Sequence, residues 1–186
     1  YKFTNIDLYK SDASKFVVDH ENKALIPPFS ALDGLGANVA ASVIEARKNG
    51  EFFVKNFDGE VVFTRDTHNK NYLDTYEGEH LPIKHCIEGY NGWLINEKIF
   101  DAAQDNFPTV VNKPTFGYAD EIASAIESLK HNPNILANVG LYNPIEQIEF
   151  VGTVTEICVI SNVLGLKPLF PDVDFIVHAD MCAGLS

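Results

Sequence analysis

The chain has 186 residues, of which 26 are acidic and 14 basic, so its formal charge is −12. This length is enough for one domain with a full hydrophobic core, and 46% hydrophobic residues are ordinary for a globular protein. Because the Lys and Arg residues do not cluster, nucleic acid and anionic membranes are disfavoured as partners. We expect a single domain over residues 1–186.

The cysteines and the chain ends give further expectations. Three cysteines, odd in number and widely spaced, do not suggest a disulfide framework, so a reducing cytoplasm is the simpler inference. No apolar run reaches the length of about 18 residues that a membrane span needs, and no signal peptide is visible. The chain ends soon after a predicted strand, so we expect that it lacks its last helix.

The first predicted strand is the apolar run Lys15–Asp19, whose composition is typical of a buried parallel strand. Asp19 would lie at its carboxyl end, where open α/β sheets place ligands. Taken alone, Asp19 is better explained as a cap of the following turn. Apolar residues at helical spacing then predict a helix over residues 36–49, which Gly50 would end.

The second strand, Val61–Asp66, also ends in an aspartate. It is followed by a polar stretch over residues 67–92 that has little periodicity and contains three histidines and a glutamate of interest: His68, Glu77, His80 and His85. A loop of this length inside a compact domain is usually functional.

The remaining segments alternate between helix and strand. Helices are predicted over residues 99–103, 118–130 and 156–166, and strands over 109–113, 148–151 and 174–178. Short apolar strands that alternate with helices indicate an α/β fold. We therefore predict a doubly wound, three-layer fold, with a mostly parallel sheet and helices on both faces.

The stretch from Val151 to Val159 joins a strand to a helix through a tight turn. Thr155 is a suitable N-cap, which places Cys158 in the first helical turn. There the unpaired backbone N–H groups and the positive end of the helix favour the thiolate. The alternative is that Cys158 is a small buried hydrophobic residue.

Asp19, Asp66, Lys113 and Cys158 all lie at the carboxyl ends of predicted strands, and so along one edge of the sheet. In a first constellation, Asp19 would accept the thiol proton of Cys158 if burial raises its pKa, and Lys113 would stabilise the ionised groups. The alternative is a structural ion pair between Asp19 and Lys113.

A second constellation is a candidate metal site. Asp66 and His68 project from the same side of an extended segment, and His85 adds a second imidazole. Glu77 or His80 would complete the set, which suits Zn²⁺, Mn²⁺ or Fe²⁺. The alternative is that these are solvated loop residues.

Four segments together resemble the cysteine hydrolases of the isochorismatase-like superfamily, and most of all the nicotinamidases. They are Phe16-Val-Val-Asp19, Phe63-Thr-Arg-Asp66-Thr-His68 with Leu81-Pro-Ile-Lys-His85-Cys86, Val111-Asn-Lys113-Pro114, and Val151-Gly-Thr-Val-Thr-Glu-Ile-Cys158-Val159. Their order and spacing extend through almost the whole chain. The second and fourth segments are specific, whereas the first is not.

The resemblance implies a catalytic triad of Asp19, Lys113 and Cys158 that hydrolyses nicotinamide to nicotinate and ammonia through a thioester. It also implies a cis peptide at Thr153–Val154, which would aim the N–H groups of Val154 and Cys158 at the oxyanion.

The resemblance further implies a divalent metal, most simply Zn²⁺, that binds the pyridine nitrogen and is held by Asp66, His68, Glu77 and His85. Phe116 would form part of an aromatic wall against the substrate. By analogy, family members commonly form homo-oligomers.

The run Asp19-His-Glu-Asn-Lys-Ala24 departs from the family pattern, since Lys23 or Ala24 stands where an aromatic residue is expected. Three alternatives therefore stay open: a cysteine hydrolase of another small amide, an isochorismatase-type hydrolase, and a non-catalytic ligand-binding member. Cys86 and Cys182 are predicted to be structural, so a catalytic Cys158 would react much faster with thiol reagents.

Overall fold

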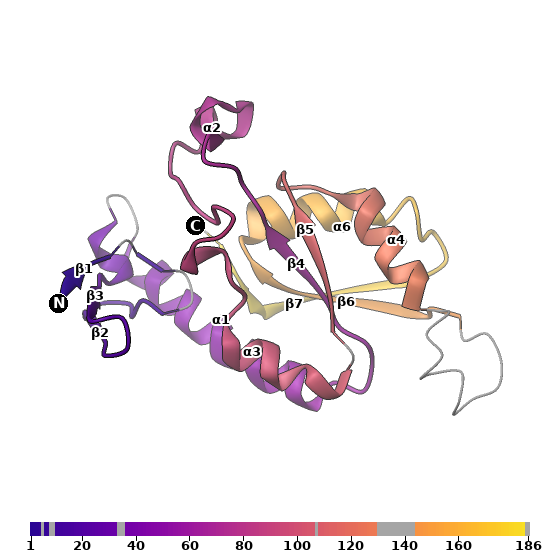
Figure 1. Cartoon of the computed structure of the whole chain (residues 1–186). Coiled ribbons are helices and arrows are strands. Elements are labelled where there is room, and N and C mark those ends of the chain that lie inside the picture. Colours follow the sequence, from indigo (N-terminus) through magenta and orange to yellow (C-terminus); the bar gives the residue numbers. More distant parts are fainter. Residues whose placement is uncertain (5, 8–9, 33–35, 107, 130–143, 185–186) are drawn as a thin grey trace.

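The computed structural model describes residues 1–4, 6–7, 10–32, 36–106, 108–129 and 144–184. Figure 1 shows helices on two sides of a central group of strands. The predicted α/β class, with parallel strands and helices on both faces, is confirmed. No helix in the described part of the chain is long and apolar enough to cross a membrane.

The central strands form two parallel pairs. β4 (Val62–Asp66) pairs with β5 (Thr109–Lys113), and β6 (Gln147–Thr153) pairs with β7 (Asp174–Ala183). Within the described residues, no backbone ladder joins the two pairs, so they are separate sheets. The prediction of parallel strands is therefore correct, but the strands do not form one continuous sheet.

Helices α4 (Ala119–Leu129) and α6 (Ile160–Leu166) cover one face of the strands. Their buried residues Ile122, Ile126 and Leu166 form a core with Phe170, against which β4, β5, β6 and β7 pack. The apolar spacing in the sequence predicted this face correctly.

On the other face lie α1 (Ala37–Asn56) and α3 (Glu97–Ala102). α1 packs its buried alanines against Ala183 of β7. The prediction that Gly50 ends α1 is wrong, because the helix continues to Asn56 and Gly50 is buried inside it. Val54, only 5% exposed, lies one helical turn after that glycine and extends the buried apolar face of the helix.

The N-terminal segment forms a separate small sheet in the order β1–β3–β2, from Lys2–Phe3, Ala24–Ile26 and Val17–Asp19. The prediction that Lys15–Asp19 is a buried parallel strand is wrong. β2 pairs antiparallel with β3, and Phe16 and Val18 are 54% and 45% exposed. β2 is antiparallel because its strand partner is β3, which follows it after a short turn.

The long polar stretch after β4 is built from short helices. These are η2 (Tyr72–Asp74), α2 (Tyr76–His80) and η3 (Asn91–Trp93), while η1 (Phe29–Ala31) and η4 (Gln104–Asn106) lie elsewhere. The Thr75 hydroxyl caps α2 by accepting a hydrogen bond from the N–H of Gly78 at 3.0 Å. In Figure 1, α2 lies above β4, and the chain after α2 returns beside β4 toward α3.

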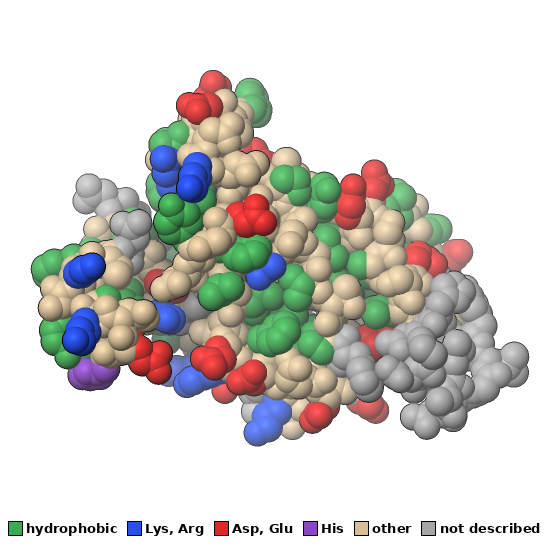
Figure 2. Space-filling view, viewed as in Figure 1, with side chains coloured by type: hydrophobic (Ala, Val, Ile, Leu, Met, Phe, Trp, Pro, Cys, Tyr) green, Lys and Arg blue, Asp and Glu red, His purple; other side chains and the backbone are tan. Residues whose placement is uncertain are grey.

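The distribution of charged side chains on the surface agrees with the expectation that the Lys and Arg residues do not cluster. On the face drawn in Figure 2, the Lys and Arg side chains lie in small, separate groups among acidic ones. This face therefore offers no continuous basic patch.

Candidate active site

Parallel pairing of β4 with β5 sets the first contact of the site. The register places Asp66 opposite Lys113, at the carboxyl ends of both strands. Lys113 is only 2% exposed, and its ammonium forms an ion pair with Oδ1 of Asp66. Burial of this cation lowers the pKa of Lys113, while the neighbouring Cys158 side chain, to which Lys113 hydrogen-bonds, raises it.

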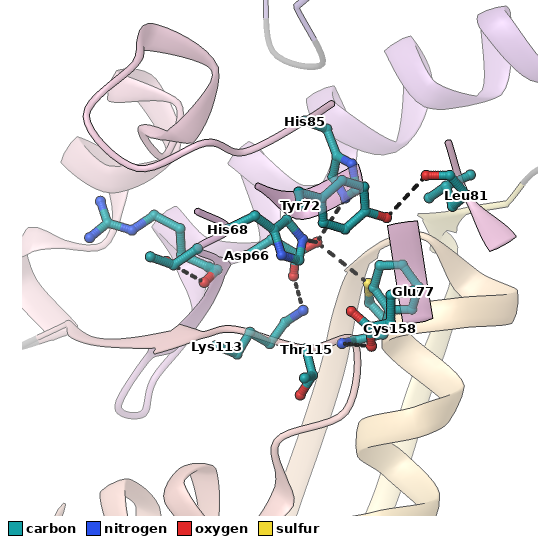
Figure 3. A network of polar contacts seen from close by, with 12 residues as sticks. Asp66, His68, Tyr72, Glu77, Leu81, His85, Lys113, Thr115 and Cys158 are labelled. Carbon is teal, nitrogen blue, oxygen red and sulfur yellow. Dashed lines mark hydrogen bonds and ion pairs between the residues drawn. The ribbon is translucent and has the colours of Figure 1, made fainter. Parts of the chain in front are cut away.

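The loop after β4 brings two imidazoles to the same carboxylate. The backbone N–H of His68 donates to the carbonyl of Cys86 at 3.0 Å, which places His85 beside it. The centroids of the two rings are 4.7 Å apart. Figure 3 shows both imidazoles next to Asp66.

The hydrogen bonds of the imidazoles fix their tautomers. Nδ1 of His85 lies 2.8 Å from the carbonyl of Ile83, and His68 bonds the carbonyl of Pro114. Because a carbonyl only accepts, each ring donates an N–H there, and in a neutral imidazole this leaves the lone pair on Nε2. Burial lowers the pKa of His68 to about 4, and the charge of His85 adds to this, so His68 is neutral at pH 7.

The three side chains fit a divalent metal. Nε2 of His68 is buried and has no hydrogen-bond partner within the described structure. It lies 4.0 Å from Oδ2 of Asp66, and Nε2 of His85 lies 3.9 Å from the same atom. All three ligand atoms are within 4.8 Å of one another. Two imidazoles and a carboxylate with an open fourth position are typical of catalytic zinc.

The fourth predicted ligand is not in this group. Oε1 of Glu77 accepts a hydrogen bond from the backbone N–H of Phe116 at 2.9 Å. His80 is exposed, and its Nδ1 bonds the carbonyl of Tyr76 at 2.9 Å. In the described structure, neither of the two predicted alternatives, Glu77 and His80, is grouped with Asp66, His68 and His85.

Cys158 lies where the sequence predicted, one turn into the helical segment after β6. The turn, η5 (Thr155–Val159), is π-helical, and the N–H of Val159 donates to the carbonyl of Val154 at 3.1 Å. The N-cap is thus Val154, not Thr155 as predicted, because the wider turn begins one residue earlier. The predicted cis peptide between Thr153 and Val154 is present.

The thiol of Cys158 faces the carboxylate of this three-residue group. Its Sγ donates to Oδ2 of Asp66 at 3.8 Å. The amide of Asn162 donates to the carbonyl of Cys158 at 2.7 Å and holds the turn in place. Burial raises the pKa of Cys182, and it raises the pKa of Cys86 to about 11.

Asp19 is not at this site. Its carboxylate accepts hydrogen bonds from the backbone N–H and side-chain amide of Asn22, at 3.0 and 2.9 Å, and lies 3.7 Å from Nζ of Lys10. The hydrogen bonds from Asn22 lower the pKa of Asp19, which is the opposite of the rise that a proton acceptor needs. In the described structure, Asp66 is the carboxylate next to Cys158 and Lys113.

Aromatic rings surround the imidazoles. The predicted Phe116 stacks on His85 at 6.3 Å between centroids. Tyr72, which the sequence reading missed, is 1% exposed and lies 4.5 Å from the ring of His68. Trp93 was also missed, although it is the single tryptophan of the chain. Its indole N–H donates to the Thr67 hydroxyl at 2.9 Å, between two of the proposed ligands.

A comparison with solved structures finds a similar fold. The crystal structure of nicotinamidase PncA from Bacillus subtilis matches with a TM-score of 0.53 and 16% sequence identity, over 100% of this chain and 88% of that one. The fold is similar to that of a nicotinamidase. At this identity the likeness concerns the fold alone.

The proteins that match in sequence are of a different kind from this structural neighbour. DNA polymerase III PolC-type from Bacillus cereus is 53% identical over 55 residues, which are 30% of this chain and 4% of the polymerase. The corresponding protein of Listeria monocytogenes is 51% identical over 89 residues, 48% of this chain and 5% of the polymerase. The chain thus spans about a twentieth of the length of these relatives. No family model matches it.

Proposed function

We propose that the chain is a metal-containing cysteine hydrolase of a small amide, with nicotinamide as its substrate. The observation that carries the proposal is the position of Cys158. Its thiol lies 3.8 Å from the carboxylate of Asp66, which also faces Lys113 and the imidazoles of His68 and His85. The nicotinamidase title of the similar structure supports the choice of substrate.

In the proposed reaction, Sγ of Cys158 attacks the carbonyl carbon of the amide. The C–N bond breaks, ammonia leaves with the thiol proton, and water then hydrolyses the thioester to the free acid. The ammonium of Lys113 stabilises the thiolate before the attack. The backbone N–H groups of Val154 and Cys158 are the proposed donors to the oxyanion.

Asp66, His68 and His85 would hold the metal, for which Zn²⁺ is the first choice. When bound, the ion supplies a Lewis-acid position that orients a ring nitrogen of the substrate. Phe116 would contact the substrate ring, since it stacks on His85. Glu77, which bonds the backbone N–H of Phe116, would be the fourth ligand of the metal.

Asp66, the proposed acceptor of the thiol proton, is a weak base. Asp66 accepts the hydrogen bond of the thiol, but it also pairs with Lys113 and would bind the metal. A carboxylate that neutralises two cations is a poor base. We therefore expect slow turnover by this chain alone.

This weakness favours a second candidate, a non-catalytic protein of the same fold that binds metal and a small ligand. The specific observation is the distant position of Asp19, which is held by Asn22 and Lys10.

Ammonia release from nicotinamide by Zn²⁺-loaded protein separates the two candidates. The hydrolase predicts release that the Cys158→Ala variant abolishes and the Cys182→Ala control retains. Equal release by both variants would exclude Cys158 as the nucleophile. No release from nicotinamide or other small amides, with metal bound, would establish the non-catalytic candidate.

A further inference from the structure

Asn162 of α6 is a buried polar residue to which the proposed reaction gives no role. It is 7% exposed and lies four residues after Cys158. Its side-chain amide donates hydrogen bonds to the carbonyls of Phe116 and Cys158, at 2.9 and 2.7 Å. Its Oδ1 accepts a hydrogen bond from the N–H of Tyr118 at 2.9 Å. The nitrogen and the oxygen of this side chain are therefore both paired, as a buried amide requires.

These three bonds join two segments that are far apart in the sequence. Phe116 and Tyr118 belong to the segment 114–118, which leads from Lys113 at the end of β5 to α4. Cys158 belongs to η5, which leads from β6 to α6. One side chain thus ties the segment that follows the buried cation to the turn that carries the thiol. We call these three hydrogen bonds the amide clamp.

Small residues let the two segments approach closely enough for the clamp to form. A Cβ on Gly117 would lie 3.4 Å from Cβ of Ser161, and a Cβ on Gly165 would lie 2.8 Å from Cβ of Ala119. The second distance is too short for two carbon atoms, so a larger residue at Gly165 would push α6 away from the start of α4. The two helices lie side by side in Figure 1 and share one core. Their close packing therefore holds the partners of the clamp at bonding distance.

The chemistry of the three partners requires an amide. Two partners are carbonyls, which accept, and the third is an N–H, which donates, so the side chain must offer two donors and one acceptor. A threonine hydroxyl has one proton, and within a helix it commonly donates to the carbonyl four residues earlier. Asn162→Thr would therefore keep the bond to Cys158 and lose the bond to Phe116. Asn162→Ala would lose every bond of the clamp.

The clamp fixes the proposed site from two sides. The hydrogen bonding of η5 is π-helical and becomes α-helical in α6, and the bond from Asn162 to the carbonyl of Cys158 spans this change. Lys113, whose side chain hydrogen-bonds that of Cys158, lies three residues before Phe116. The ring of Phe116 stacks on His85. A shift of either segment would therefore move the thiol relative to the cation and to the ring.

We propose that Asn162 is a positioning residue, which holds the thiol of Cys158 beside Lys113 and at a fixed place relative to Phe116. The part that concerns the substrate rests on the proposed function, whereas the position of the thiol can be tested without turnover. An error of about 1 Å in the placement of reacting groups can cost about 100-fold in rate. A residue with this task controls the reactivity of the thiol as well as the stability of the fold.

The first test is the rate at which iodoacetamide alkylates Cys158 at pH 7, with peptide mapping and at a temperature far below melting. Asn162→Ala should slow this alkylation about tenfold or more, because the thiol loses its fixed contact with Lys113. Asn162→Thr should stay within about threefold of the wild-type rate, because it keeps the bond to the carbonyl of Cys158. Leu164→Ala, at a position of α6 that is 64% exposed, is the control and should leave the rate unchanged. Alkylation of Cys182 in the same samples reports any general loosening of the fold.

Gly165→Ala disturbs the clamp while it retains Asn162, and it keeps the inference testable if Asn162→Ala does not fold. The added methyl group should displace α6 and slow the alkylation of Cys158 in the same direction. When both variants fold, the double variant should be little slower than Asn162→Ala, because the clamp is already lost. Additive slowing would overturn the inference, since packing of α6 would then place the thiol without the clamp.

Turnover of nicotinamide adds a second readout. Asn162→Ala should lower kcat and raise KM, whereas Asn162→Thr should raise KM and keep kcat, because it releases Phe116 alone. Absence of ammonia release by the wild-type chain would refute the hydrolase, and the alkylation rates would still decide the role of Asn162. That role is overturned if Asn162→Ala is less stable to urea but alkylates Cys158 at the wild-type rate, which is the behaviour of a purely structural amide. Wild-type alkylation of Cys158 in Gly165→Ala would overturn it as well.

Discussion

Nε2 of the buried His68 lies 4.0 Å from Oδ2 of Asp66 and has no hydrogen-bond partner within the described structure. A buried nitrogen with a free lone pair is costly unless a ligand satisfies it. Nε2 of His68 and the carboxylate of Asp66 are therefore best explained as two ligands of a metal ion.

His68→Ala should lower the affinity for Zn²⁺ strongly. Loss of a residue that merely orients a ligand typically costs about 10- to 100-fold in metal affinity, and loss of a ligand should cost at least as much. Metal per chain after dialysis, measured by mass spectrometry, checks this. His80→Ala is the matched control, since His80 is exposed and bonds Tyr76, and equal metal loss in both variants would contradict the assignment.

Thiol labelling at pH 7 should modify Cys158 first. Its side chain hydrogen-bonds the buried Lys113, whereas burial raises the pKa of Cys86 and of Cys182. Below the pKa of a thiol, its thiolate fraction rises about tenfold per pH unit, so labelling of Cys182 should increase steeply towards alkaline pH. Peptide mapping of the labelled protein identifies the sites, and fast labelling that persists in Cys158→Ala would refute the prediction.

Lys113→Ala should destabilise the metal-free protein by about 3–5 kcal/mol, because it leaves the carboxylate of Asp66 without its buried cation. Urea unfolding provides the free energy. A second variant, Asp66→Asn with Lys113→Met, removes both charges and should recover most of the loss. Lys48→Ala, at an exposed position, should change stability little. Additive effects of the two site substitutions would mean that the pair is not coupled.

Trp93→Phe isolates one hydrogen bond of the loop that carries the ligands. The guanidinium carbon of Arg65 lies 3.8 Å from the centroid of the Trp93 ring, and phenylalanine retains an aromatic ring there but loses the N–H that donates to Thr67. We expect a loss of about 1 kcal/mol in unfolding free energy and a several-fold weaker hold on Zn²⁺. Competition with a chelator measures the second effect, and unchanged metal affinity would show that Trp93 only supports the fold.

Gly78→Ala should disturb the position of Glu77. A Cβ at Gly78 would lie 2.0 Å from the carbonyl oxygen of Tyr72 and 2.8 Å from Cα of Leu73, so the backbone must move. Overpacking of this kind typically costs about 1–3 kcal/mol. The control is Gly92→Ala, where nothing lies within 4 Å. Calorimetric melting of both variants tests the difference, and equal melting temperatures would contradict the contact.

Several features of the site followed from local sequence alone. Apolar runs and their spacing gave β4, β5, β6 and α4, and with them the positions of Asp66, Lys113 and Cys158 at strand ends. The Asp-Thr-His spacing predicted that Asp66 and His68 share one side. These predictions hold because side-chain direction and strand termination depend on a few neighbouring residues.

The tertiary structure decided what depends on pairing between distant segments. Lys15–Asp19 has the composition of a buried strand, yet β3 pairs with it locally and keeps Asp19 away from Cys158. Glycine commonly follows the end of a helix, yet α1 continues through Gly50 to Asn56 because the residues after Gly50 also pack against the core. The separation of the parallel strands into two sheets, β4 with β5 and β6 with β7, likewise could not be predicted from the sequence. Local pattern limits which elements form, whereas the partners of each strand edge are set by contacts across the whole chain.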